Sequence, residues 1–418
     1  MNRVVVTGIG FASSIGVGRA EVLSSLREMR HGFALQQLAG EGVGPKLVFG
    51  KVDGFDFSGS EGRDWTFPGT DGLDPTFVSS LSPHGAFALV ALEEALGHAG
   101  VDRAGLSDGK TGLACASAGS ARLMHHHLKR MAEANWRRVS PAGIVSSIAG
   151  TLNFNLATHY GIRGANCGFV SACTSSSHAL GYAFDEIALG RQERMLVVGA
   201  EEGEAESLLP FQGMRALSNN PDPDTASRPF DKKRDGFVGT GGGAALVLES
   251  VGFARKRGVE PLAEFLSWGQ ASDGHSVAAP HPEGMGIQTA MEISLEAAKV
   301  DASSIDWVNA HATSTPAGDR AEATALKALG FAGQGTPVSS TKGLHGHGLS
   351  YAGSLEAAIC VMCLSSGIVP GNAALTDPDP ACEGLNLPTT TEAKDLRIVL
   401  NNNSGFGGSN VCQVFAKP

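Results

Sequence analysis

Membrane-spanning segments, secretion signals and low-complexity runs are missing from this sequence of 418 residues. Apart from glycine-interrupted segments that suit a protein core, no uncharged stretch reaches the roughly 18 residues that span a bilayer, so no membrane contact is expected. After Met1–Arg3 the only apolar run before Thr7 is Val4–Val6, which predicts no signal peptide. The 56 glycines occur without repeats and predict many tight turns rather than disorder.

Positive charge is also scarce, with 32 Lys and Arg residues against 42 Asp and Glu residues. The resulting net charge of −10 argues against nucleic acid as a partner. The seven cysteines are an odd number in apolar surroundings, which favours a reducing compartment over a disulfide framework. We therefore expect an ordered protein of the cytoplasm.

Alternating strand and helix patterns predict a layered α/β protein. The first half opens with a strand at 4–6 and a helix at 19–30, and residues 52–83 are expected to form a surface excursion before a helix at 84–99. The alternation begins again at about residue 251, with strands expected at 263–268, 305–310, 338–340, 396–401 and 411–416 and helices at 287–298, 320–329 and 353–364. The order of elements predicts two similar halves, 1–250 and 251–418, in one continuous body.

Two local patterns suggest metal binding but are better explained otherwise. The histidines at 125–127 lie on a predicted helix, where consecutive side chains point in different directions and cannot converge on one ion. With Lys129, Arg130, Arg137 and Arg138 they form a basic region that could dock an acidic partner. The Cys360-Val361-Met362-Cys363 sequence lies in an apolar helical run without a second ligand pair, so no metal site is expected.

Cys173 stands where small residues lead into a predicted helix that begins near Ala179. A thiol at a helix start meets unpaired N–H groups and the positive end of the helix dipole, which favours a nucleophilic thiolate. Taken alone, however, the same stretch favours a small buried thiol over a nucleophile.

Three further polar clusters follow predicted strands. His311 lies in the cluster 309–319, Lys342, His345 and His347 lie in 340–348, and 401–410 is a glycine-rich turn whose backbone N–H groups could bind an oxyanion. One thiol, two histidines and a donor-rich turn form a constellation suited to acyl transfer through a covalent thioester.

These motifs resemble those of the elongating β-ketoacyl-[acyl-carrier-protein] synthases. The resemblance covers nearly the whole chain, from Val-Thr-Gly-Ile-Gly near the start through Ser-Arg-Pro-Phe-Asp at 227–231 to Ser-Gly-Phe-Gly-Gly-Ser-Asn at 404–410. It implies a thiolase-like α-β-α-β-α fold built from two similar halves. It also implies decarboxylative condensation of an acyl thioester on Cys173 with malonyl-[acyl-carrier protein], in fatty-acid or polyketide synthesis.

The resemblance further implies roles for individual residues. Cys173 would carry the acyl chain, while His311 and His347 would donate hydrogen bonds to the malonyl thioester carbonyl as CO₂ leaves. Lys342 would order and polarise the site together with Glu322.

Other residues would bind and orient the substrate. The backbone N–H groups of Cys173 and Phe406 would form the oxyanion hole, Phe237 and Phe406 would act as gates, and Thr313 and Thr315 would contact the pantetheine arm. The family needs no cofactor beyond the phosphopantetheine of its acyl-carrier protein, and a homodimer is implied.

Some positions depart from the family pattern. Ala312 replaces a glycine, His345 adds an imidazole, and Ser350-Tyr351 replaces a pair of small residues. The segment 60–84 has no match to the family's Arg-rich helix.

Two alternatives share the fold. A thiolase would need a second cysteine near the C-terminus, but Cys412 lacks the expected glycine neighbours. A non-catalytic chain-length-determining partner usually lacks the nucleophile, whereas Cys173 is present.

Overall fold

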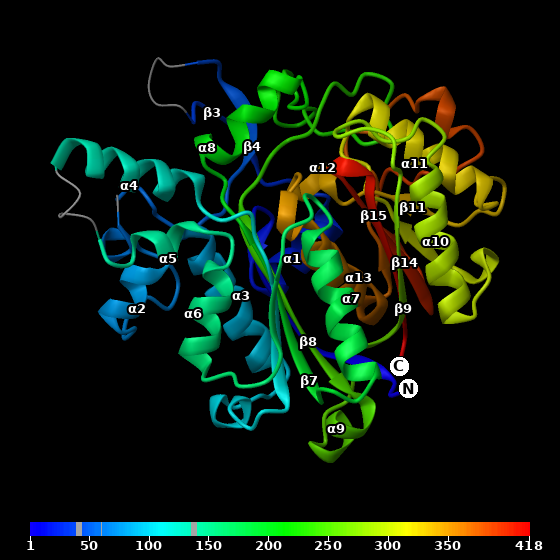
Figure 1. Ribbon diagram of the computed structural model, residues 1–418. Coiled ribbons are helices and arrows are strands. Elements are labelled where there is room, and N and C mark those ends of the chain that lie inside the picture. The colour runs from blue at the N-terminus through cyan, green and yellow to red at the C-terminus, as the bar shows by residue number, and fades with distance from the viewer. Residues whose placement is uncertain (39–43, 60, 135–139) are drawn as a thin grey trace.

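The computed structural model describes residues 1–38, 44–59, 61–134 and 140–418 (Figure 1). One large sheet runs through both halves in the order β11-β10-β14-β15-β9-β1-β8-β7-β5-β6, with β2 attached to β1. Its strands are β1 (Val4–Ser13), β2 (Gly16–Val17), β5 (Thr111–Ala116), β6 (Asn166–Phe169), β7 (Arg194–Glu201), β8 (Gly242–Ser250), β9 (Ala263–Ser272), β10 (Trp307–Asn309), β11 (Val338–Ser339), β14 (Ile398–Gly405) and β15 (Ser409–Ala416). Two small hairpins pair β3 (Phe33–Gln36) with β4 (Leu47–Gly50) and β12 (Ile368–Val369) with β13 (Glu392–Ala393).

The helices complete a layered α-β-α-β-α arrangement, as predicted (Figure 1). They are α1 (Arg19–Glu28), α2 (Pro75–Ser80), α3 (Pro83–His98), α4 (Ala121–Ala134), α5 (Gly143–Ser147), α6 (Thr151–Tyr160), α7 (Ser175–Ala188), α8 (Ala205–Leu208), α9 (Val251–Lys256), α10 (Met285–Ala298), α11 (Pro316–Ala328), α12 (Lys342–His345) and α13 (Ala352–Ser366). The helices α7 and α13 form the central layer, α3 and α6 cover the sheet of the first half, and α10 and α11 cover that of the second.

The central position of α13 explains its composition. The segment Leu349–Ser366 is apolar enough to cross a membrane by length and composition, but 89% of that window is buried inside the protein. A helix surrounded by other elements is apolar on all sides rather than amphipathic. Both Cys360 and Cys363 pack in this layer, as expected for core residues.

The two central helices approach each other closely at Gly353. A Cβ atom at this position would lie 2.7 Å from the backbone nitrogen of Ser177, so only glycine fits. This contact brings α13 against the first turn of α7, directly after Cys173.

The segment 52–83, expected to form a surface excursion, is exposed at many positions, but several of its aromatic side chains are buried. Phe57, Trp65 and Phe67 are buried in the core beside α3, and Trp65 packs edge-on against Phe57 at 5.4 Å. The Asp74 side chain accepts hydrogen bonds from the first backbone N–H groups of α2. Because the aromatic residues are separated by Gly, Asp and Ser, no periodic pattern revealed that they share one core.

The parallel strands determine where polar residues gather. The strand β5 pairs in parallel with β6 and β7, and β10 pairs in parallel with β11 and β14. The loops that follow β6, β10, β11 and β14 therefore carry their side chains to one end of the molecule, near α12 in Figure 1.

Candidate active site

The predicted thiol and histidines meet at this end of the sheet. Cys173 follows β6, His311 follows β10, and His347 follows β11 and α12. Nε2 of His347 lies 3.0 Å from Sγ of Cys173, and the rings of His311 and His347 are 5.3 Å apart and nearly perpendicular. Residues far apart in the sequence thus form one compact group.

The backbone at Cys173 makes a sharp turn into α7. Ala172 has a φ of +51°, in the left-handed region that side chains other than glycine rarely adopt. A Cβ atom at Gly405 would lie 3.1 Å from the backbone nitrogen of Cys173. The turn after β14, which carries Phe406, is therefore packed directly against the backbone of Cys173.

Burial rather than the helix start dominates the charge state of Cys173. Burial raises the pKa of its thiol to about 12, and the positive charge of Lys342 only partly opposes this rise. Burial therefore opposes the thiolate that the helix start is expected to favour.

Both active-site histidines are neutral. Burial lowers the pKa of His311 and of His347 well below the usual range, and the nearby Lys342 ammonium lowers both further. A neutral imidazole carries a single N–H and can also accept a hydrogen bond. Each ring can therefore donate to an oxygen that becomes negative.

Lys342 pairs with a carboxylate that the sequence did not reveal. Its Nζ forms a buried ion pair with Glu356 of α13. Glu322 instead accepts hydrogen bonds from the backbone N–H groups of His311 at 2.8 Å and Ala312 at 2.7 Å. A signal for Glu356 was available, because it is the only acidic residue in the apolar helix α13.

A cavity of about 400 Å³ leads to Cys173. Phe237 packs edge-on against the His347 ring at 5.2 Å, and Phe211 joins Phe237 to Phe406, which is 36% exposed. Phe211 lines the same cavity.

The two predicted threonines also line this cavity. The hydroxyl oxygens of Thr313 and Thr315 lie 3.0 Å apart. Their polar surface faces the approach to the thiol, as a polar substrate arm would require.

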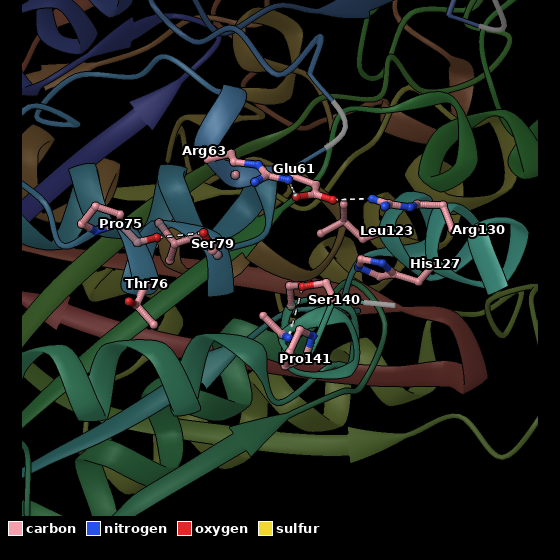
Figure 2. Close-up of a pocket in the computed structure, with 14 residues that line it drawn as sticks. Glu61, Arg63, Pro75, Thr76, Ser79, Leu123, His127, Arg130, Ser140 and Pro141 are labelled. Carbon is pink, nitrogen blue, oxygen red and sulfur yellow. Dashed lines mark hydrogen bonds and ion pairs between the residues drawn. The ribbon is translucent and has the colours of Figure 1, made fainter. Parts of the chain in front are cut away.

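A second hollow of about 580 Å³ lies between α2, α4 and α5, and it shares no lining residue with the Cys173 cavity (Figure 2). Figure 2 shows Glu61 between the guanidinium groups of Arg63 and Arg130, with which it forms ion pairs. The proposed basic region on α4 is thus partly neutralised. Its other members, Arg137 and Arg138, lie outside the described residues.

The cysteine that a thiolase would need is elsewhere. Cys412 is fully buried in β15 and packs with α10 and α11, whereas Cys173 belongs to a separate apolar cluster with Leu208, Phe237 and Leu349. The thiolase alternative therefore has no second thiol at this site.

Comparisons with known proteins agree with this geometry. Residues 1–254 match the family described as "Beta-ketoacyl synthase, N-terminal domain", and residues 262–376 match "Beta-ketoacyl synthase, C-terminal domain". The chain is 35% identical to the 3-oxoacyl-[acyl-carrier-protein] synthase 1 of Haemophilus influenzae, over 100% of this chain and 99% of that protein.

Solved structures show the same relationship. A β-ketoacyl synthase from Burkholderia phymatum superposes with a TM-score of 0.87 at 31% identity over the full length of both chains. A type II polyketide ketosynthase, solved with its acyl-carrier protein, superposes with a TM-score of 0.87 at 25% identity, over 100% of this chain and 99% of that one.

The fold is that of a condensing enzyme. The chain belongs to the β-ketoacyl synthase family. Its reaction is the decarboxylative condensation of an acyl thioester with a malonyl thioester, as in fatty-acid and polyketide synthesis.

The high pKa of Cys173 predicts how the free thiol reacts with iodoacetamide. Since the thiolate is the nucleophile, the alkylation rate should rise about tenfold per pH unit from about pH 6.5 to 9.5 without a plateau. Lys342→Ala should slow alkylation, because it removes the cation that opposes the pKa rise. Peptide mapping measures the alkylation rate, with Cys173→Ala as the background control. A plateau in this rate below about pH 8 would contradict a raised pKa for Cys173.

Proposed function

We propose that Cys173, His311 and His347 carry out this condensation. The observation that carries the proposal is the 3.0 Å contact between Sγ of Cys173 and Nε2 of His347, with His311 beside it. In the first step, the sulfur of Cys173 forms a thioester bond to the acyl carbon and the phosphopantetheine thiol leaves. The proton of Cys173 passes through the imidazole of His347 to the leaving thiolate.

In the second step, the bond between C2 of the malonyl group and its carboxylate breaks. CO₂ leaves, and the electron pair forms an enolate whose oxygen accepts hydrogen bonds from His311 and His347. C2 then attacks the thioester carbon on Cys173, and the backbone N–H groups of Cys173 and Phe406 stabilise the oxyanion. Breakage of the C–S bond releases the β-ketoacyl product and a thiolate, which takes up a proton.

Two charged residues, Glu322 and Lys342, support the two histidines. Glu322 accepts hydrogen bonds from the backbone N–H of His311 and so holds the strand end that carries the imidazole. Lys342 favours the neutral state of both histidines at the pH of the reaction. In this proposal neither residue transfers a proton.

The cavity residues select and guide the substrate. Phe237 and Phe406 gate access to the thiol, and Thr313 and Thr315 contact the pantetheine arm; all four line the cavity. The steps use only side chains, backbone N–H groups and thioesters, so no further cofactor is proposed. All seven cysteines are free thiols, which supports a place in the reducing cytoplasm.

Replacement of the nucleophile separates the two steps. Cys173→Ala should lower condensation on the order of 10³-fold or more, because no thioester can form, while malonyl decarboxylation continues through the two histidines. Product analysis by mass spectrometry measures both. Cys412→Ala is the matched control and should keep condensation, and full condensation activity in Cys173→Ala would refute the proposal.

We propose that the acyl-carrier protein docks at the mouth of the Cys173 cavity. Arg215 is exposed there, next to Met214, and lines the cavity entrance. On α4, by contrast, Arg130 and Lys129 face the acidic partners Glu61 and Glu133. A cation beside an apolar side chain suits an acidic carrier whose pantetheine arm enters the cavity.

Charge reversal tests this docking site. Arg215→Glu should raise the KM for a malonyl-carrier substrate roughly tenfold, through repulsion of the acidic carrier, and should leave the KM for malonyl-pantetheine unchanged. Lys256→Glu, on α9 at the opposite end of the molecule, is the control (Figure 1). Equal effects on both substrates, or no effect on either, would exclude Arg215 from docking.

We also propose a homodimer formed through β6. This strand ends the large sheet and pairs only with β5 among the described residues. The apolar side chains of Ile144, Phe154 and Val170 are exposed nearby, the last by 66%. An unpaired strand edge beside exposed apolar residues suits pairing with a second copy across a twofold axis.

Sedimentation should therefore give twice the mass of one chain, because isolated β6 edges are unfavourable in water. The substitution Val170→Glu should shift the mass toward that of a single chain, whereas Val277→Glu, which is exposed elsewhere, should not. A wild-type monomer, or a dimer only with a different chain, would contradict the proposal.

A further inference from the structure

His345 is a buried imidazole that the condensation steps do not use. It closes the single turn of α12, and its side chain has no exposed surface. Its Nε2 lies 2.9 Å from the hydroxyl of Thr341 and 3.9 Å from the Oε1 of Glu356 that pairs with Lys342. A polar ring in this position needs a hydrogen-bonding role to offset its desolvation.

The directions of the surrounding hydrogen bonds assign the proton on this ring. The hydroxyl group of Thr341 has one proton and donates it to Oδ1 of Asn309 at 3.4 Å. Oδ1 is an amide oxygen, which can only accept a hydrogen bond. With the hydroxyl proton of Thr341 used in this way, Nε2 of His345 is the donor in the 2.9 Å bond to Thr341. A protonated Nε2 also suits the nearby carboxylate of Glu356, and burial keeps the ring neutral by lowering the pKa of His345 to about 3.

The same direction continues through a row of asparagines. Nδ2 of Asn309 donates to Asn401 at 2.9 Å, Nδ2 of Asn401 donates to Asn403 at 3.3 Å, and Nδ2 of Asn403 donates to Oε2 of Glu356 at 2.5 Å. All of these N–H donors point in the same direction along the row, and the last one donates to the carboxylate of Glu356. Hydrogen bonds arranged in this manner polarise and strengthen one another.

This row connects every segment of the active site. Asn309 ends β10 just before His311, and Asn401 and Asn403 lie on β14 before Phe406. Asn403 also accepts a hydrogen bond from the hydroxyl of Ser177, in the first turn of the helix that follows Cys173. The ring of His345 thus lies at the start of the row, and its Nε2 is 3.9 Å from the carboxylate at the end of the row.

We propose that His345 is a positioning residue that starts a row of hydrogen bonds running through Thr341 and the asparagines to Glu356. The row holds the four strand-end segments in register for the reaction. This inference rests on the proposed function of Cys173 and the two histidines. It assigns a role to the imidazole that departs from the family pattern.

Two substitutions test the donor role. In His345→Phe the ring volume is kept and the donor is lost, so kcat for condensation should fall roughly tenfold with little change in KM, as for other residues that orient a reacting group. His345→Gln keeps a side-chain N–H and should recover most of the activity. Thermal unfolding of each variant confirms that it is folded.

A double mutant separates positioning from a general loss of packing. Thr341→Val removes the next link, so the His345→Phe/Thr341→Val protein should lose no more kcat than either single variant. If His345→Phe does not fold, Thr341→Val alone must show the same loss of kcat. Additive losses, wild-type kcat in His345→Phe, or no recovery with Gln would overturn the inference. A wild-type protein that does not condense would instead refute the proposed function.

Discussion

The active site depends on one buried positive charge. Lys342 is 1% exposed and is paired with Glu356, which is buried as well. Removing one member of such a pair leaves an uncompensated charge in the core, so the two residues stabilise the site only together. The field of Lys342 favours neutral histidines and opposes the rise in the pKa of Cys173, and it thereby prepares a thiol and two N–H donors.

The fold makes this charge possible. The central helices α7 and α13 are covered by sheet on both sides, so Glu356 and the first turn after Cys173 are excluded from water. Parallel strands in both halves end on the same side and deliver their loops to one place. Chemistry that needs a dry, preorganised group of donors is therefore located where the two halves meet.

Much of the fold and part of the active site were predictable from sequence. The strand and helix order, and the positions of Cys173, His311 and His347 after strands, follow from local periodicity and composition. The partner of Lys342 was not predicted: Glu356 stands out as the only acidic residue of α13, but only the packing of α13 places it beside Lys342. The helix start at Cys173 is visible in the sequence, whereas the extent to which burial raises the pKa of its thiol is not.

The acyl-enzyme is the most direct test of the account. Intact-protein mass spectrometry after incubation with an acyl-carrier thioester, without a malonyl donor, should show one acyl group, mapped by peptide analysis to Cys173. Addition of malonyl-carrier should remove this group and yield a β-ketoacyl product two carbons longer. An acyl group on another residue, or condensation without any acylated Cys173, would contradict the account.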